Sequence, residues 1–299
     1  MSQIPCQEKT LNGAKGCSFG DMCGYIDVHC HLTGGEYGDV DTLLKSVEDA
    51  GVTKVITVGF DLPSSEACAE LAAKYSMVYF TAGFHPTELD KYREGDLIEI
   101  ASLLSEKKCV ALGETGLDYH YENTDKPLQH EVFAAQLELV DKAGLPVEIH
   151  SRDCAEDMLE FLTERAALLK HGALLHCYSH SPELALRFEK LGISFSFGGT
   201  STWKGSKRSK KSIAALPLNL LLTETDSPYM PPASKYGTFP NTPASIPEIT
   251  ANMAEIKGVE TGVMAEQVWA NAHRLFKKLG NSNCPCNMAQ PTRIYTRLK

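Results

Sequence analysis

Side chains of the types that bind metal ions recur at the ends of predicted strands in this chain. The motif Asp27-Val-His29-Cys-His31 closes the first strand. Because side chains two residues apart on a strand point to the same side, His29 and His31 can share one ion. Later strands each end on, or are followed by, one further candidate: Glu114, His150, His176 and Asp226. Such a set predicts hydrolysis assisted by divalent metal ions.

Short β-rich runs alternate with helix-period segments along the chain. The predicted strands are Tyr25–His29, Lys54–Val58, Val78–Ala82, Cys109–Leu112, Pro146–His150, Ala173–His176, Ile193–Phe197 and Leu220–Thr223. Helical segments are expected between them, for example at Asp41–Ala50, Ser64–Tyr75, Leu97–Glu106, Pro127–Ala143 and Asp153–Lys170. This alternation predicts a parallel sheet closed into a TIM (β/α)₈ barrel. An open doubly wound sheet is the alternative, which the lack of a glycine-rich nucleotide fingerprint after the first strand disfavours.

A barrel would bring the candidate ligands together, because the C-terminal ends of its strands converge on the face that carries the active site. Six ligands exceed the four that one zinc takes, and they suit two ions bridged by a carboxylate and a water. We expect Glu114, from the middle of the barrel order, to be the bridge. The remaining ligands divide into His29, His31 and Asp226 for one ion and His150 and His176 for the other.

The expected catalytic groups follow from this arrangement. A water held between two cations loses its proton near neutral pH and becomes a nucleophile. Asp226, beside that water, would accept the proton and pass it on. Glu114 and Asp226 are therefore predicted to take part in catalysis as well as in metal binding.

Composition limits the class of protein. The chain has 299 residues, of which 43% are hydrophobic, and a formal net charge of −9. That hydrophobic content excludes disorder as the main state, and the acidic balance disfavours a non-specific DNA coat protein. There is no apolar run of membrane-spanning length and no secretory signal pattern. We expect an intracellular protein, cytoplasmic or nuclear, that is not secreted and whose ten scattered cysteines are free thiols.

One catalytic domain is expected. Helix and strand periodicity runs through residues 24–280, whereas residues 1–23 and 281–299 lack it. The two ends are therefore predicted to be an N-terminal extension and a C-terminal tail that flank a single barrel.

The motifs resemble those of the TatD-related metal-dependent deoxyribonucleases, which are amidohydrolase-like barrels. The matching segments are Asp27-Val-His29-Cys-His31-Leu, Gly83-Phe-His85-Pro86, Gly113-Glu114-Thr-Gly-Leu-Asp118-Tyr, His150-Ser-Arg152-Asp, Leu175-His176-Cys-Tyr and Leu222-Thr-Glu224-Thr-Asp226-Ser-Pro-Tyr. Their order and spacing hold from about Tyr25 to Leu279. The resemblance implies a TIM barrel that hydrolyses phosphodiester bonds in DNA, with 3′–5′ exonuclease action on single strands. By motif it implies the same six ligands.

Two further residues are candidates for substrate contact. His85 either bonds a loop or donates to a non-bridging phosphate oxygen, and the resemblance favours the second role. Arg152 either makes a bidentate contact to phosphate or fixes a neighbouring carboxylate, Asp118 or Asp153. Asp118 and Glu224 are expected to orient the metal ligands.

A basic run stands out against the acidic background. Five cations lie between Lys204 and Lys211, and Lys207 and Arg208 are at its centre. The run is either a solvated helix face or a track for a nucleic-acid backbone. The neighbouring Trp203 is either a packing residue or a ring that stacks on a base.

One segment departs from the family pattern. Members commonly carry an Arg-Asn-Glu-Pro-like segment after the last ligand, and here the corresponding stretch is Phe239-Pro-Asn241-Thr-Pro243. The asparagine and a proline are kept, but the arginine and glutamate are not. The resemblance therefore constrains the substrate less than the metal centre.

Three classes of function fit these features. The first is a metal-dependent deoxyribonuclease, an ester-bond hydrolase acting on single strands or ends of DNA. The second is a metal-dependent hydrolase of an amide, a lactone or an aminoacyl ester on tRNA, and the third is a binding protein on a retained scaffold. The complete ligand set disfavours the third, and the basic run favours the first over the second. Four imidazoles favour zinc or manganese, although the family is often described as magnesium-dependent.

Overall fold

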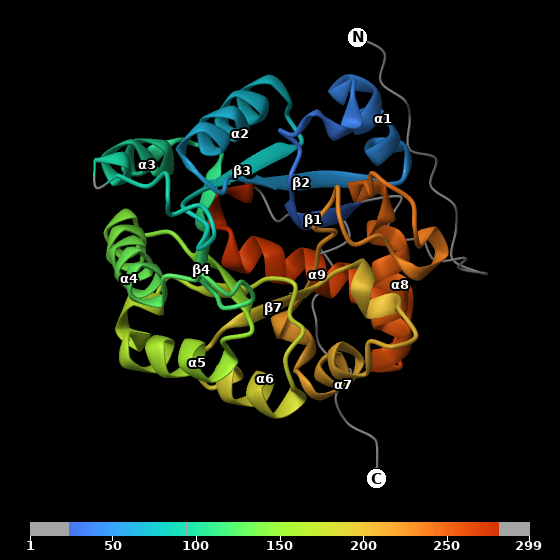
Figure 1. Ribbon diagram of the computed structural model, residues 1–299. Coiled ribbons are helices and arrows are strands. Elements are labelled where there is room, and N and C mark those ends of the chain that lie inside the picture. Colours follow the sequence, from blue (N-terminus) through green and yellow to red (C-terminus); the bar gives the residue numbers. More distant parts are fainter. Residues whose placement is uncertain (1–23, 94, 281–299) are drawn as a thin grey trace, which may run out of the picture.

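Eight parallel strands form the centre of the molecule. The computed structural model describes residues 24–93 and 95–280, so the predicted extensions 1–23 and 281–299 lie outside the described residues. Each strand pairs with its sequence neighbours in the order β1 to β8, and the helices surround this ring (Figure 1). The predicted TIM barrel is confirmed, and the doubly wound alternative is wrong.

The strands agree with the predicted ones except in length. They are β1 Tyr25–Cys30, β2 Val52–Val58, β3 Val78–Ala82, β4 Cys109–Asp118, β5 Val147–Arg152, β6 Ala173–Leu175, β7 Ser194–Phe197 and β8 Leu221–Thr223. The predicted end of β4 at Leu112 is wrong, because the chain beyond it still pairs with β5, as far as Asp118 opposite Arg152. Glu114 therefore lies inside a strand rather than after one.

Helices follow each strand in turn. They are α1 Val40–Asp49, α2 Leu62–Lys74, α3 Asp96–Ser105, α4 Lys126–Ala143, α5 Ala155–Glu164, α6 Pro182–Glu189, α7 Lys207–Ala215, α8 Ile246–Lys257 and α9 Thr261–Leu275. Local sequence explains their ends: Asp125 accepts the Leu128 N–H at the start of α4, and Gly144 ends that helix with φ of 71°. The single helix expected over Asp153–Lys170 is wrong, since the backbone leaves the helical region at Arg165.

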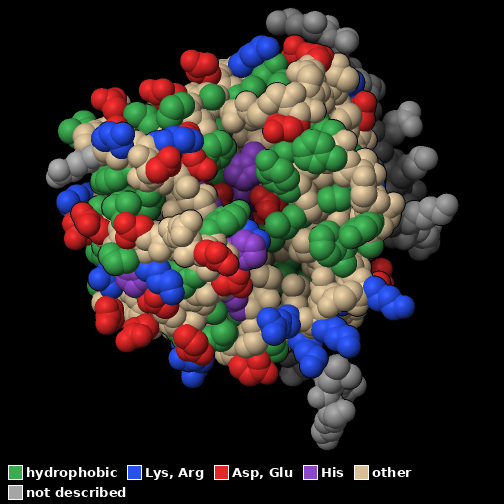
Figure 2. Space-filling model, viewed as in Figure 1, with side chains coloured by type: hydrophobic (Ala, Val, Ile, Leu, Met, Phe, Trp, Pro, Cys, Tyr) green, Lys and Arg blue, Asp and Glu red, His purple; other side chains and the backbone are tan. Residues whose placement is uncertain are grey.

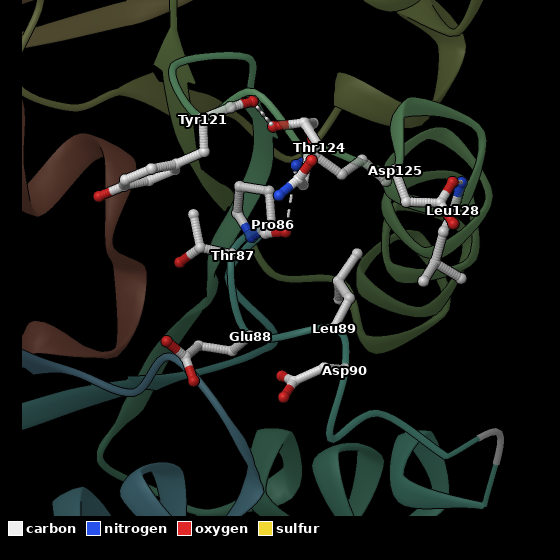
Figure 3. Close-up of a pocket in the computed structure, with 11 residues that line it drawn as sticks. Pro86, Thr87, Glu88, Leu89, Asp90, Tyr121, Thr124, Asp125 and Leu128 are labelled. Atoms are coloured by element: carbon white, nitrogen blue, oxygen red, sulfur yellow. Dashed lines mark hydrogen bonds between the residues drawn. The ribbon is translucent and has the colours of Figure 1, made fainter.

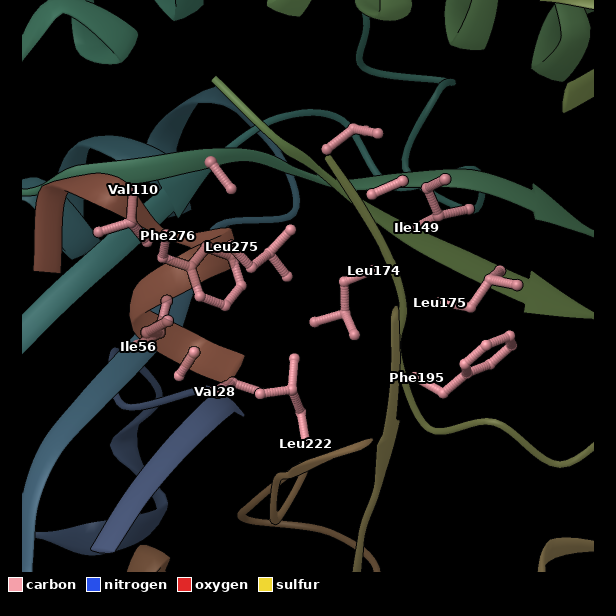
Figure 4. Close-up of a cluster of buried hydrophobic side chains, with 14 of the residues drawn as sticks. Val28, Ile56, Val110, Ile149, Leu174, Leu175, Phe195, Leu222, Leu275 and Phe276 are labelled. Atoms are coloured by element: carbon pink, nitrogen blue, oxygen red, sulfur yellow. The ribbon is translucent and has the colours of Figure 1, made fainter. Parts of the chain in front are cut away.

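Apolar side chains fill the part of the barrel toward the N-terminal ends of its strands. Val28, Ile56 and Val110 from the strands pack with Leu275 and Phe276 at the end of α9 (Figure 4), and all five are buried. The end of α9 thus closes the N-terminal end of the barrel. The polar side chains of the candidate ligands lie at the opposite, C-terminal end.

The ring closes where β1 meets the end of β8 and the segment that follows it. The Thr223 hydroxyl donates to the Ile26 carbonyl at 3.0 Å, and the Asp226 N–H donates to the His29 carbonyl at 3.0 Å. Thr225 donates its hydroxyl to buried Asp27 at 2.5 Å and its N–H at 3.1 Å. Burial raises the pKa of Asp27 to about 7 despite these bonds. This seam sets where Asp226 lies relative to His29.

Replacing Thr225 tests the seam. Thr225→Val keeps the shape but removes the hydroxyl from a fully buried pair, so the free energy of unfolding should fall by about 1–3 kcal/mol. Urea denaturation followed by circular dichroism measures the change. Thr163→Val is the control, because that hydroxyl bonds only the Leu159 carbonyl of its own helix. An equal fall in the free energy of unfolding in both variants would show that the bond between Thr225 and Asp27 stabilises the fold no more than an ordinary hydrogen bond within a helix.

Candidate metal centre

The six predicted ligands meet at the C-terminal end of the barrel. Glu114 is buried at their centre, with 4% of its surface exposed. Histidine and acidic side chains lie at the bottom of a hollow in the middle of this face (Figure 2). Residues far apart in the chain therefore become neighbours, as the barrel prediction requires.

One oxygen of Glu114 faces His29, near the end of β1, and His31, just after that strand. The Nε2 atoms of His29 and His31 are 3.2 Å apart. Each lies 3.5 Å from Oδ1 of Asp226. Oε2 of Glu114 is 3.7 Å from the first ring and 3.9 Å from the second. Two nitrogens and two carboxylate oxygens thus surround one small volume.

The outer nitrogens of these rings show that the set fits a cation. Nδ1 of His31 is 3.1 Å from the Val58 carbonyl, which only accepts, so this nitrogen carries the proton. Nδ1 of His29 is 2.7 Å from Oε1 of Glu148. With both Nδ1 atoms protonated, the two Nε2 atoms face each other and two carboxylates. These nitrogens can each take a second proton or give a lone pair to a cation, and this donor set suits a divalent metal ion.

The other oxygen of Glu114 faces a second set. Oε1 lies 2.7 Å from Nε2 of His176 and 2.9 Å from Nδ1 of His150. The second ring nitrogen of His150, Nε2, lies 2.9 Å from Oδ2 of Asp118. The second ring nitrogen of His176, Nδ1, is buried without a hydrogen bond and lies 3.8 Å from Oε2 of Glu224. Asp118 and Glu224 therefore lie where the sequence predicted groups that orient ligands.

The imidazole rings around Glu114 decide its protonation. Burial alone would raise the pKa of this carboxyl, but His176, His85 and His150 outweigh burial and hold the pKa well below its usual range. Burial and the neighbouring His29 lower the pKa of His176 to about 4, so this ring is neutral at pH 7, as a ligand must be. Glu114 is thus an ionised carboxylate, and the neutral ring of His176 faces it through Nε2 at 2.7 Å.

Two backbone conformations and one side-chain amide hold the ligands in place. Gly116 has φ of 144°, and a Cβ there would lie 2.0 Å from the His150 carbonyl, so only glycine lets β4 and β5 approach this closely. Asp226 has φ of 51°, a left-handed conformation that aspartate tolerates. Asn241 braces its loop by donating to the carbonyls of Tyr229 at 2.9 Å and Thr225 at 3.3 Å.

His85 points its protonated nitrogen at the centre. The Thr87 N–H donates to Nδ1 at 3.2 Å, so the proton of the neutral ring is on Nε2. Nε2 lies 3.4 Å from Oε1 of Glu114. Burial lowers the pKa of His85, which keeps the ring neutral. The ring can therefore donate a hydrogen bond toward a ligand of the centre.

Arg152 does not fix a carboxylate. Asp118 is bonded by His150 and by the His120 N–H, and Asp153 by the His120 ring at 3.0 Å. The exposed guanidinium instead lies 5.9 Å from the ring of Tyr121. The alternative that Arg152 fixes Asp118 or Asp153 is therefore wrong, and its contact to phosphate stays a prediction.

Trp203, Lys207 and Arg208 form no hydrogen bond or ion pair with the six candidate ligands. Trp203 is partly buried, and its Nε1 donates to the Pro231 carbonyl at 2.9 Å. Lys207 and Arg208 are exposed in the first turn of α7. The predicted contacts of these three residues to a nucleic-acid strand stay predictions.

A cavity of about 590 Å³ opens beside His85. It lies between the loops after β3 and β4 and the first turn of α4 (Figure 3). Glu88, Asp90 and Asp125 are among its lining residues, together with Tyr121. Three carboxylates, one of them paired with Lys91 at 2.6 Å, give this cavity an acidic lining.

Sequence reasoning missed Glu148. This carboxylate is fully buried and bonds the outer nitrogen of His29. Its signal was an acidic residue between Val147 and Ile149 in an otherwise apolar strand, two residues before His150. At that position it shares the side of β5 that carries the ligand.

Comparison with known proteins agrees with this geometry. A sequence profile described as "TatD related DNase" matches residues 26–277. The chain belongs to the TatD-related DNase family. YabD of Bacillus subtilis, named an uncharacterized metal-dependent hydrolase, is 34% identical over 253 residues, which are 84% of this chain and 98% of YabD. The protein is thus a metal-dependent hydrolase of the TatD family.

Two further TatD relatives connect the chain to a named activity and to a solved structure. The TatD of Klebsiella pneumoniae, named a 3′-5′ ssDNA/RNA exonuclease, is 31% identical over 259 residues, 84% of this chain and 97% of that protein. The crystal structure of YjjV, a TatD homologue of Escherichia coli K12, superposes with a TM-score of 0.81 and 31% identity. The match covers 85% of this chain and 98% of YjjV. Within residues 24–93 and 95–280, no helix is long and apolar enough to cross a membrane.

Glu148 offers a test of the candidate centre. Glu148→Gln removes the charge that holds the proton of His29 on Nδ1, so affinity for Mn²⁺ or Zn²⁺ should fall about 10–100-fold. Titration calorimetry on chelator-stripped protein measures the affinity. Glu131→Gln, an exposed change on α4, is the matched control and should bind metal as the wild type does. Unchanged affinity in Glu148→Gln would refute its role.

Proposed function

We propose that this protein is a metal-dependent deoxyribonuclease that hydrolyses phosphodiester bonds in single-stranded DNA or at DNA ends, as a 3′–5′ exonuclease. The observation that supports this most is Glu114, whose two carboxylate oxygens face two separate sets of donors. Paired metal sites that share a carboxylate suit displacement at phosphorus. The exonuclease name of the Klebsiella pneumoniae relative points to the same chemistry. Residues 24–280 would form the one catalytic domain.

The donors assign a ligand set to each ion. Oε2 of Glu114 would serve the first ion and Oε1 the second. The other proposed ligands are His29, His31 and Asp226 for the first ion and His150 and His176 for the second. Zinc or manganese should bind tightest, and magnesium would fill a site where phosphate supplies further oxygens. Held by these residues, such ions would polarise a phosphoryl oxygen and lower the pKa of a water.

The protein's own groups would position the substrate and move the proton. Asp226 lies within 3.5 Å of both His29 and His31, where it can take the proton of the attacking water. His85 would donate from Nε2 to a non-bridging phosphate oxygen. The exposed guanidinium of Arg152 would bind a further phosphate through two parallel hydrogen bonds.

Basic residues at the start of α7 favour a nucleic acid over an uncharged ester or amide. Lys207 and Arg208 are exposed there, and Lys and Arg side chains gather over α7 near the central hollow (Figure 2). A helix N-terminus adds partial positive charge to the same place. A polyanion gains from this site in an otherwise acidic chain, whereas a lactone does not.

Glu114→Ala tests the proposed function. Chelator-stripped protein is mixed with end-labelled single-stranded DNA and Mg²⁺, Mn²⁺ or Zn²⁺. The wild type should give a metal-dependent ladder from the 3′ end, and the variant should be about 10³-fold slower, since metal ions supply several kcal/mol of transition-state stabilisation. Glu131→Ala, on the exposed face of α4, should cleave as the wild type does.

The alternatives give different results in this assay. Equal activity in wild type and Glu114→Ala would identify a contaminating nuclease. No activity in either, with metal still bound to the wild type, would contradict the deoxyribonuclease proposal. Amides, lactones and aminoacyl esters would then be the substrates to test.

Lys207 and Arg208 should control the salt dependence of strand binding. Changing both to serine should reduce the slope of log affinity against log salt by about 1.4, at about 0.7 for each lost phosphate contact on a single strand. Fluorescence anisotropy in chelator measures binding without cleavage. Lys107→Ser with Lys142→Ser is the matched pair, because both exposed lysines lie toward the N-terminal end of the barrel. An unchanged slope in the α7 variant would refute the proposed contacts of Lys207 and Arg208 to the DNA backbone.

A further inference from the structure

Exposed aromatic side chains are concentrated on the loop between β8 and α8. Tyr229, Tyr236 and Phe239 are 53%, 75% and 60% exposed, and Met230 beside them is 39% exposed. These four are half of the eight large hydrophobic side chains that are exposed among the described residues. Single exposed hydrophobic residues need no explanation, but a cluster beside a candidate active site indicates a binding surface.

The rings are held in place by the fold. Tyr236 meets Trp203 edge to face at a centroid distance of 5.6 Å, and Tyr229 lies 6.2 Å from Phe239. Trp203 is itself fixed by its bond to the Pro231 carbonyl. We call Tyr229, Tyr236 and Phe239 the aromatic platform. Trp203 supports this platform from a partly buried position, whereas the wider exposed surfaces belong to the platform rings.

The aromatic platform adjoins both the metal centre and the basic start of α7. The Tyr229 N–H donates to the carbonyl of Asp226 at 3.0 Å, so the platform begins at a candidate ligand. The Ser206 N–H donates to the Trp203 carbonyl at 3.2 Å, one residue before Lys207. In Figure 2, hydrophobic side chains border the hollow on the side of α8, and basic side chains lie over α7. Ring faces and cations therefore lie on the same side of the centre.

This combination fits an unpaired nucleic-acid strand. Bases stack on exposed rings, and phosphates pair with lysine and arginine along the same path. Duplex bases are already stacked on one another and cannot use such a surface.

We propose that the aromatic platform binds unpaired bases of the strand whose phosphodiester lies at the metal centre, and so selects single strands over duplex. This inference rests on the proposed function and adds to it the surface that recognises strand form. It differs from the earlier prediction for Trp203, because the stacking rings come from a loop distant from Trp203 in sequence.

Strand binding without cleavage tests the proposal. Chelator-stripped protein is titrated into a labelled single strand of about twenty nucleotides, longer than the roughly 4–16 nucleotides that one OB fold covers. Tyr236→Ala with Phe239→Ala should bind about tenfold more weakly, which corresponds to about 1.4 kcal/mol. Tyr236→Phe with Phe239→Tyr keeps both rings and should bind as the wild type does. Ile98→Ala, which removes a 72% exposed side chain from α3, is the matched control.

Two further probes isolate the bases. A strand of abasic residues keeps the phosphates, so the wild type should bind it about tenfold more weakly than the natural strand. The alanine variant should bind both strands alike, and its affinity for duplex should equal that of the wild type. Unchanged affinity of the alanine variant for the natural strand would overturn the proposal. An equal loss for natural, abasic and duplex DNA would overturn it too.

A small substrate separates the platform from the proposed function. Methyl p-nitrophenyl phosphate is a diester without a nucleobase, so the alanine variant should hydrolyse it at the wild-type rate. If neither this diester nor DNA is hydrolysed but the variant still loses single-strand affinity, the proposed function fails and the platform stands. If both are hydrolysed and strand affinity is unchanged, the platform fails and the proposed function stands.

Discussion

A carboxylate removed from water needs compensating charge, and Glu114 is such a group at the centre of this barrel. Four imidazole rings, those of His29, His85, His150 and His176, lie within 3.7 Å of its oxygens. Rings that present lone pairs cannot supply positive charge unless they are protonated. Metal ions supply that charge without a proton, and the family to which the chain belongs is one of metal-dependent hydrolases. The arrangement of the surrounding elements follows from the need to bring these groups together.

The barrel places the polar groups of the centre at its C-terminal end and the apolar core, which stabilises the fold, toward its N-terminal end. Apolar side chains and the end of α9 fill the N-terminal end, so the fold does not depend on the centre for its core. At the C-terminal end the chain accepts unfavourable features, among them buried carboxylates and a left-handed Asp226. The seam between Asp27 and Thr225 connects the two regions, since it closes the ring beside the loop that carries Asp226.

The sequence predicted the barrel and the meeting of six ligand-type residues because both depend on simple regularities. Strand and helix periods alternate, and polar residues stand where apolar strands end. Other features had no local signal. Gly113 and Gly116 interrupt the strand pattern of β4, so its continuation to Asp118 shows only through pairing with β5. The role of Glu148 depends on the position of His29 on another strand.

The surface was predictable only in part. The basic run at the start of α7 is visible in the sequence, but its neighbours are not. Tyr236 and Trp203 come from different loops, and only the folded chain shows that one ring supports the other. Exposure of Tyr229 and Phe239 likewise depends on how Asn241 folds the loop back against its own start. The proposed recognition of a DNA strand therefore depends on tertiary structure rather than on a sequence motif.

Anomalous diffraction from crystals soaked in Mn²⁺ tests most directly whether Glu114 joins two metal sites. We expect two anomalous peaks, one between Oε2 of Glu114 and the rings of His29 and His31, the other between Oε1 and the rings of His150 and His176. Glu114→Ala crystals should lose or weaken both peaks. A single peak, or two peaks of which neither contacts Glu114, would contradict the shared carboxylate on which the proposed chemistry depends.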